Sequence, residues 1–160
     1  MIRVDPFTLF DRNWALLTAG TADDFNTMTI SWGMLGTLWG KPAATVYVRE
    51  SRYTLAFLEK YDWFSISFFD EEWKKDLGIL GTVSGRDENK IAMTKLTPVP
   101  VGEDHQVMGF AQAKMTLICR KMYQQGMDPG CIPPDVRQRF YADFDFHRMF
   151  VGEVTEVEAA

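Results

Sequence analysis

The chain has 160 residues, 46% of them hydrophobic and 14% aromatic, which favours one packed domain over residues 1–160 and excludes a disordered chain. A formal net charge of -5 disfavours general nucleic-acid binding, because affinity for a phosphate backbone requires accumulated positive charge. Two cysteines without metal-ligand spacing, and no apolar run of signal-peptide or membrane-spanning length, predict a soluble cytoplasmic protein without a metal site or membrane segment. Aromatic side chains exceed what a minimal core needs, so some are expected to face a flat ligand or a partner subunit.

Strands dominate the predicted elements in the first part of the chain. Residues 14–19 form a short apolar run, and residues 27–32 and 43–49 are rich in β-branched and aromatic side chains, so all three are predicted strands. Residues 51–54 are expected to lead into a short helix, with a hydroxyl side chain near the helix start.

The second part continues with short helices, strands and loops. Residues 63–69 alternate, with phenylalanine and isoleucine on one face and serine on the other, which predicts a half-buried strand. Residues 70–80 resemble a helix with Asp70 as its N-cap. The remaining expected elements are a Gly- and Ser-rich loop at 81–87, a brief helical stretch near residue 90, a strand at 113–119, a loop at 126–134 and a final strand at 147–157, in which Gly152 indicates a bulge or tight bend.

Together these elements predict a mainly β fold with short helices. Strands that follow one another without long helices between them favour a compact antiparallel barrel over a parallel α/β sheet. No glycine-rich fingerprint joins a predicted first strand to a helix, so the sequence gives no support to a dinucleotide-binding α/β fold.

Residues 26–32 place small hydroxyl side chains beside larger apolar ones. In a strand, Thr27, Thr29 and Ser31 share one face, and Met28 and Ile30 share the other. Such a strand would offer hydroxyl and backbone donors to the polar edge of a planar heteroaromatic ring and apolar contact to its face. The alternative is an ordinary strand surface facing solvent, which the pattern alone favours because a domain has few ligand sites.

Two further segments have the composition of a phosphate site. Residues 49–54 combine Arg49 and Arg52 with hydroxyl side chains at a predicted helix start, where free N–H groups and the helix dipole attract phosphate. Residues 84–90 combine a flexible Ser-Gly turn with Lys90, which adds a point charge. The alternatives are a capped surface helix with two solvated arginines and an ordinary solvated loop.

The other reactive residue types give weaker signals. His147 precedes an apolar strand and would serve as a proton donor or ring contact, or as a surface or interface residue. Asp143 and Asp145 alternate with it, but two carboxylates and one histidine are too generic to predict a metal site. Cys119 is expected to be packed in the core and Cys131 to be exposed, and neither is marked as a nucleophile.

From about residue 14 onward, the ordered set of segments resembles the flavoredoxin-like branch of the flavin reductase family. The residues that carry this resemblance are Asn26-Thr27-Met28-Thr29-Ile30-Ser31-Trp32, Leu38-Trp39-Gly40-Lys41-Pro42, Val46-Tyr47-Val48-Arg49, Ser51-Arg52-Tyr53-Thr54, Leu80-Gly81-Thr82, Ser84-Gly85-Arg86-Asp87, Lys90 and Asp145-Phe146-His147-Arg148-Met149-Phe150-Val151-Gly152-Glu153-Val154. One departure is Glu50, where relatives of this branch often carry proline. A carboxylate there weakens the local positive potential unless it points away or pairs with Arg52.

The resemblance implies an FMN-binding split β-barrel that forms a homodimer with the flavin near the subunit interface. It implies that residues 27–31 meet the isoalloxazine ring, that residues 49–54 and 84–90 surround the ribityl phosphate, and that His147, the candidate catalytic residue, lies near the flavin or the nicotinamide. The expected cofactor-binding residues are Asn26, Thr27, Met28, Thr29, Ser31, Arg49, Ser51, Arg52, Tyr53, Thr54, Ser84, Gly85 and Lys90.

The function expected on this basis is an NAD(P)H:flavin reductase-like oxidoreductase that passes reducing equivalents through FMN, either tightly bound or exchangeable. Its acceptor would be free flavin, a redox protein or a monooxygenase. The alternative is a flavoredoxin-type electron carrier, or a flavin-binding protein, without a nicotinamide site of its own. A third alternative is an interaction barrel without a ligand, because one fold supports several roles.

Overall fold

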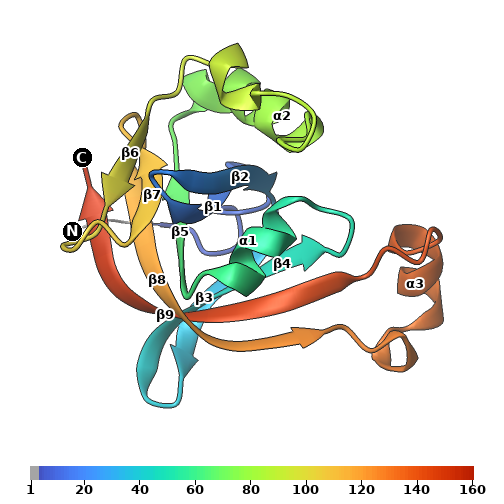
Figure 1. Cartoon of the computed structure of the whole chain (residues 1–160). Coiled ribbons are helices and arrows are strands. Elements are labelled where there is room, and N and C mark those ends of the chain that lie inside the picture. The colour runs from blue at the N-terminus through green and yellow to red at the C-terminus, as the bar shows by residue number, and fades with distance from the viewer. Residues whose placement is uncertain (1–3) are drawn as a thin grey trace.

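The computed structural model describes residues 4–160, and Figure 1 shows a strongly curved sheet with short helices around it. The strands are β1 (Ala15–Thr21), β2 (Asp24–Ile30), β3 (Gly33–Leu38), β4 (Lys41–Arg49), β5 (Trp63–Phe68), β6 (Pro98–Val101), β7 (Val107–Phe110), β8 (Met115–Gly126) and β9 (His147–Ala159). The α-helices are α1 (Thr54–Lys60), α2 (Lys74–Thr82) and α3 (Pro134–Phe140), and single 3-10 turns occur at η1 (Glu71–Trp73), η2 (Lys90–Met93) and η3 (Pro129–Cys131). The expectation of a mainly β, antiparallel fold with short helices is confirmed.

Seven strands form one antiparallel sheet in the order β2-β1-β5-β8-β9-β4-β3, and β6 and β7 pair separately. β2 and β3 therefore lie at opposite edges of this sheet, yet only Ser31 and Trp32 connect them. A connection of this length spans about 10 Å at most, so the sheet must curl until its two edges come close together. The short crossing at residues 31–32 thus makes the sheet a nearly closed barrel.

Large apolar side chains fill the inside of the curve. Phe64, Phe68 and Phe150 are fully buried there with leucines and valines from neighbouring strands. Gly152 in β9 lies against this core, because a Cβ atom added to it would come within 2.6 Å of the Phe64 ring. The pairing of β8 with β9 shifts register next to Gly152, between Lys121 and Tyr123. The expected irregularity at Gly152 is therefore present.

The prediction that residues 63–69 form a half-buried strand is wrong, because β5 is buried on both faces. The Ser65 hydroxyl donates to the carbonyl of Met108 (2.6 Å), and the Ser67 hydroxyl bonds with that of Thr116 (3.1 Å). Both serines are fully buried. Strand β7 packs over this face. Neither β6 nor β7 was predicted from the sequence.

Several element boundaries also differ from the prediction. β2 ends at Ile30, so residues 31–32 lie outside the strand. The segment after Asp70 begins with a 3-10 turn, and Asp70 makes no capping bond but pairs with Lys114 (3.1 Å). Within the expected loop at 126–134 lies a 3-10 turn, and α3 begins at Pro134. Figure 1 shows that α3 lies at the ends of β8 and β9, away from the other helices. None of the helices in residues 4–160 is long and apolar enough to cross a bilayer.

Candidate functional site

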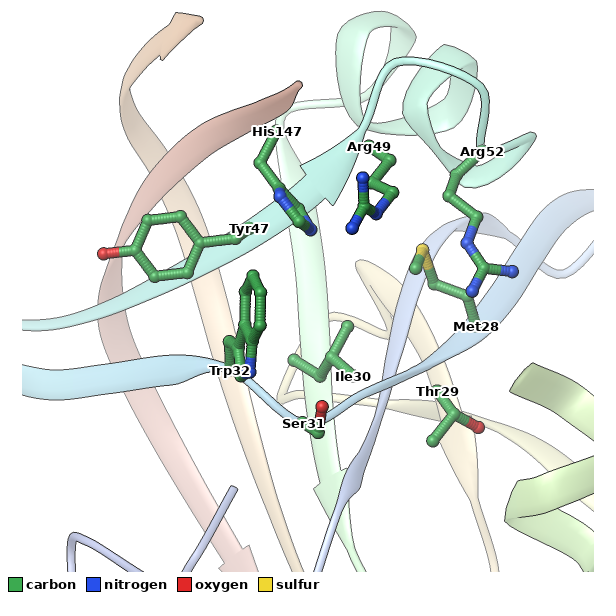
Figure 2. A pocket seen from close by; sticks show the side chains of 9 residues that line it. All are labelled: Met28, Thr29, Ile30, Ser31, Trp32, Tyr47, Arg49, Arg52 and His147. Carbon is green, nitrogen blue, oxygen red and sulfur yellow. The ribbon is translucent and has the colours of Figure 1, made fainter. Parts of the chain in front are cut away.

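A cleft of about 210 Å³ opens where the chain crosses from β2 to β3. It is lined by Met28, Thr29, Ile30, Ser31, Trp32, Tyr47, Arg49, Arg52 and His147, which Figure 2 shows gathered around one space. One wall is formed by the end of β2 and the two residues that follow it. The opposite wall comes from β4, the turn after β4 and the start of β9. Two segments predicted separately from the sequence, 26–32 and 49–54, therefore share one cleft.

The β2 wall offers backbone hydrogen-bonding groups as well as apolar contact. Among residues 4–160, β2 pairs only with β1, so alternate N–H and C=O groups on its outer edge have no strand partner. Met28 and Ile30 are nearly buried beside this edge, each 5% exposed. A flat ring placed along the wall would find donors and acceptors at its rim and an apolar surface against part of its area.

The hydroxyl groups of the same strand are less available than the alternation predicts. Thr27 does not line the cleft, because its hydroxyl is buried against that of Thr18 (2.9 Å). Thr29 lines the cleft, but its hydroxyl donates to the carbonyl of Leu77 in α2. Ser31 retains a hydroxyl with no hydrogen-bond partner among the described residues. The wall therefore presents mainly backbone groups, with Ser31 as its hydroxyl.

Two arginines make the opposite wall positive. Arg52 donates from Nη1 to the carbonyl of Gly81 (2.9 Å), and no carboxylate of residues 4–160 lies within ion-pair distance of it. Arg49 donates to the carbonyls of Asp145 (2.7 Å) and Phe140 (3.0 Å). Arg49 also lies 3.9 Å from the exposed carboxylate of Asp143. The acceptor of Arg52 is a carbonyl, which positions a guanidinium without neutralising its charge, so this wall attracts an anion mainly through Arg52.

Lys90 adds a third cation next to Arg52. Its side chain is buried, and Nζ donates to the carbonyl of Leu80 (3.0 Å). Burial, together with the nearby charge of Arg52, lowers the pKa of Lys90 to about 8. A buried ammonium without a carboxylate partner is costly, which marks this place as one where a bound anion would be strongly favoured.

The three predicted segments meet at this basic end. Asn26, at the start of the first segment, donates from Nδ2 to the hydroxyl of Thr54 in the second (2.8 Å). A Cβ atom added to Gly85 of the third segment would lie 2.2 Å from Oδ1 of Asn26 and 3.5 Å from the Lys90 side chain. Gly85 is therefore required for the loop to pack this closely on β2.

Other expected site residues are occupied elsewhere or lie at the margin. Ser51 bonds through its backbone N–H and hydroxyl to Asp145 (3.1 and 2.6 Å). The Ser84 hydroxyl accepts from the N–H of Arg86 within its own loop (3.2 Å). Tyr53 packs edge-on against Phe57, and the Arg86 guanidinium lies over its ring. The short helix expected after residues 51–54 is α1, which begins at Thr54, and no hydroxyl caps it.

His147 projects into the cleft between Trp32 and Arg49, as Figure 2 shows. Its ring lies 5.1 Å from the ring of Trp32, and its Nδ1 lies 2.7 Å from the hydroxyl of Tyr141. Burial, together with the charge of Arg49, lowers the pKa of His147 to about 4. His147 is therefore uncharged at neutral pH, and it serves in this state as a hydrogen-bonding group rather than as a cation.

Comparison with known proteins identifies the family to which this chain belongs. Residues 7–160 match the flavin reductase like domain. The chain belongs to the flavin reductase-like family. No curated protein matches it.

Solved structures share the fold of this flavin reductase-like chain at low sequence identity. Flavoredoxin from Methanosarcina acetivorans is 20% identical with a TM-score of 0.72, over 100% of this chain and 75% of that one. An FMN-binding protein from Thermus thermophilus is 21% identical with a TM-score of 0.70, over 99% and 79%. A putative flavin reductase with a split barrel domain from Shewanella frigidimarina is 11% identical with a TM-score of 0.72, over 97% and 72%. The expected split β-barrel is confirmed.

Some residues of the cleft in this flavin reductase-like chain were not among the individual cofactor-binding residues expected from the sequence. Ile30, Trp32 and Tyr47 line it, and Tyr141 supports His147 from behind. Ile30 and Trp32 lie within the predicted segment 26–32, and Ile30 belongs to the part of it that was expected to meet the ring. No group of three or more His, Cys, Asp or Glu side chains in residues 4–160 is arranged to hold a metal ion.

Proposed function

We propose that this chain binds FMN in the cleft and passes reducing equivalents from NAD(P)H through the flavin to an acceptor. The observation that carries the proposal is the combination of two unlike surfaces in one site. Residues 28–32 offer a backbone edge with apolar contact, and Arg52 and Lys90 offer charge without a carboxylate partner. FMN has the two matching parts, a flat heteroaromatic ring and a phosphate.

The donor set fits a phosphate. Arg52 and Lys90 each use a donor on a backbone carbonyl, and a guanidinium has five N–H donors while an ammonium has three. Thr54 accepts from Asn26, which leaves its own hydroxyl proton free to donate. These groups would hold the phosphate by charge-assisted hydrogen bonds, the strongest kind available to side chains. Membership of the flavin reductase-like family supports the same assignment.

Bound FMN would supply the hydride and electron transfer, as cofactors do in such enzymes. The chain's own residues bind and orient it. Backbone N–H groups at the β2 edge stabilise negative charge on a ring without reorganising. Ile30 and Trp32 line the cleft and would shield part of the ring from water, and His147 would provide an uncharged hydrogen-bonding group from the opposite wall.

Anaerobic mixing of the FMN-loaded protein with NADH or NADPH tests the proposed activity. We expect the flavin absorbance near its visible maximum to fall in a single turnover, faster than the same nicotinamide reduces free FMN. No change with either nicotinamide, while dithionite still reduces the bound flavin, would contradict the reductase and leave the electron carrier. A protein that neither purifies yellow nor quenches added FMN fluorescence would contradict flavin binding itself.

A second copy of the chain is part of the proposal, because one face of β3 is apolar and uncovered. Phe7, Met34 and Trp39 are 89%, 61% and 68% exposed. Phe7 and Met34 line a hollow that shares Ser31, Trp32 and Tyr47 with the cleft. A cleft of about 210 Å³ is smaller than the roughly 300–1,000 Å³ typical of ligand sites. The exposed side chains of Phe7, Met34 and Trp39 form an apolar band. A homodimer through β3 would cover this band and enlarge the flavin site.

A further inference from the structure

The hydrogen bond between Tyr141 and His147 lies directly behind the cleft. The Tyr141 hydroxyl is 2.7 Å from Nδ1 of His147, and the two rings meet edge-on with centroids 5.5 Å apart. Nε2 of His147 has no hydrogen-bond partner among residues 4–160, and the imidazole points into the cleft in Figure 2. One ring nitrogen is thus held from behind, and the other is left for whatever occupies the cleft.

Tyr141 is held rigidly enough to set the orientation of the histidine. It is 4% exposed, and its ring stacks on that of Phe146, with centroids 5.0 Å apart. The Arg49 guanidinium also lies over the Tyr141 ring, 5.3 Å from its centroid. Arg49 also donates to the carbonyl of Phe140, the residue before Tyr141. A hydroxyl fixed in this way loses little further freedom when it bonds to the imidazole.

The protons of the Tyr141–His147 pair can be arranged in two ways. In the first, the Tyr141 hydroxyl donates to Nδ1, and Nε2 carries the imidazole proton. In the second, Nδ1–H donates to the tyrosine oxygen, and the phenolic proton turns to Sδ of Met127, which lies 3.5 Å from that oxygen. An imidazole nitrogen is a much stronger acceptor than a thioether, so the phenolic proton favours Nδ1 of His147 over Sδ of Met127, as in the first arrangement.

We propose that Tyr141 is a positioning residue, whose hydroxyl donates to Nδ1 and so fixes His147 as the Nε2–H tautomer, an uncharged hydrogen-bond donor aimed at the cleft ligand. The hydrogen bond made by one imidazole nitrogen sets which nitrogen carries the proton. The identity of that ligand as FMN rests on the proposed function. Its ring has carbonyl and imine acceptors that an N–H group recognises.

The charges around His147 support the uncharged form. Arg49 and Arg52 face the imidazole from the end of β4 and the turn after it, and both disfavour a second positive charge. Asp145 favours that charge but has a smaller effect than burial and Arg49. Burial raises the pKa of Tyr141 and outweighs the opposing charge of Arg49, so its hydroxyl keeps the proton that it donates.

Imidazole ¹⁵N NMR of the unliganded protein tests the tautomer directly. The chain has two histidines, and exposed His105, at a φ of 53°, is replaced by asparagine to assign the signals. We expect His147 to show a protonated Nε2 and an acceptor Nδ1 at pH 7. Tyr141→Phe should convert this pattern to a mixture of tautomers. A wild-type His147 protonated at Nδ1, or a pattern unchanged in Tyr141→Phe, would overturn the proposal.

Titration with FMN supplies the functional half of the test. Tyr141→Phe keeps the ring and removes only the hydroxyl, so we expect FMN affinity to fall roughly 2- to 10-fold. Tyr61→Phe is the matched control, because its hydroxyl bonds to Asp24 away from the cleft (2.7 Å), and it should leave the affinity unchanged. Equal affinities in all three proteins would overturn the role of His147 in ligand binding. A wild type that fails to bind FMN would contradict the proposed function, while the NMR result would still decide the tautomer.

Discussion

Oε1 of Glu50 lies 3.1 Å from Nη2 of Arg148, and the same guanidinium also contacts Glu59. The Glu50 carboxylate therefore does not pair with Arg52, which donates to a backbone carbonyl instead. Glu50 is the one residue of segment 49–54 whose charge opposes phosphate binding. Its pairing with Arg148 on β9, which Glu59 shares, partly offsets that charge.

Replacing Glu50 with glutamine should therefore leave cofactor binding almost unchanged. We expect the FMN dissociation constant to change by less than about twofold. The free energy of unfolding should change by less than about 1 kcal/mol, because the ion pair is partly exposed. Fluorescence titration and urea unfolding measure the two quantities. Markedly tighter FMN binding in the variant would show that the carboxylate does weaken the phosphate site.

Arg52→Ala and Lys90→Met should weaken FMN binding much more than riboflavin binding. Riboflavin lacks the phosphate, and loss of a charge-assisted hydrogen bond costs about 1.5–3 kcal/mol. Parallel fluorescence titrations with the two ligands measure the difference. Lys114→Met is the matched control, since Lys114 pairs with Asp70 on the surface (3.1 Å). This variant should bind both ligands as the wild type does. Equal losses for FMN and riboflavin would place Arg52 and Lys90 outside the phosphate site.

Lys90 should also make the stability of the unliganded protein depend on pH above neutrality. Burial lowers its pKa from 10.5 to about 8, so between these values the unfolded chain binds more protons than the folded one. Folding stability from this group therefore rises as the pH goes from 8 to 10.5. We expect the wild type to gain about 1–3 kcal/mol relative to Lys90→Met across this window. Urea unfolding of both proteins at pH 7.5, 9 and 10.5 checks the difference, and parallel curves would contradict it.

The sequence predicted those parts of the site that local composition encodes. Arginines and hydroxyls at 49–54, a Ser-Gly turn before Lys90 and a strand of mixed polarity at 26–32 are visible without the fold, and the structure brings the three segments together. What the sequence could not reveal was the internal use of each hydroxyl. Thr27 and Thr29 alternate as surface residues would, but their partners Thr18 and Leu77 come from other elements.

Long-range packing explains the other differences. Ser65 and Ser67 read as a solvent-facing row because serine usually is exposed, and only the distant strands β7 and β8 supply their acceptors and partners. The contact of Tyr141 with His147 could not be predicted from the sequence for the same reason. Tyr141 follows α3, and the Gly and Pro residues of 126–134 had predicted a loop up to the point where this helix begins. Its hydroxyl meets His147 only because the chain folds back at the start of β9.

Met34→Asp should convert the proposed dimer to a monomer. Met34 is 61% exposed on β3 in the apolar band, and a buried unpaired carboxylate in an interface costs several kcal/mol. Sedimentation velocity at micromolar concentration should show a dimer for the wild type and a monomer for the variant. Met93→Asp is the matched control, because Met93 is similarly exposed (50%) but lies near α2. A wild type that sediments as a monomer would contradict the dimer.

Gly152→Ala should destabilise the barrel where β9 bends over the core. The added Cβ would lie 2.6 Å from the Phe64 ring and 2.8 Å from Cβ of Cys119, and both side chains are fully buried, so neither can move aside cheaply. Overpacking of this kind costs about 1–3 kcal/mol. Gly126→Ala, at the exposed end of β8, is the control, because a Cβ atom there meets nothing within 4 Å. Urea unfolding should give a lower midpoint for Gly152→Ala alone, and equal midpoints would mean that β9 shifts to accommodate the methyl group.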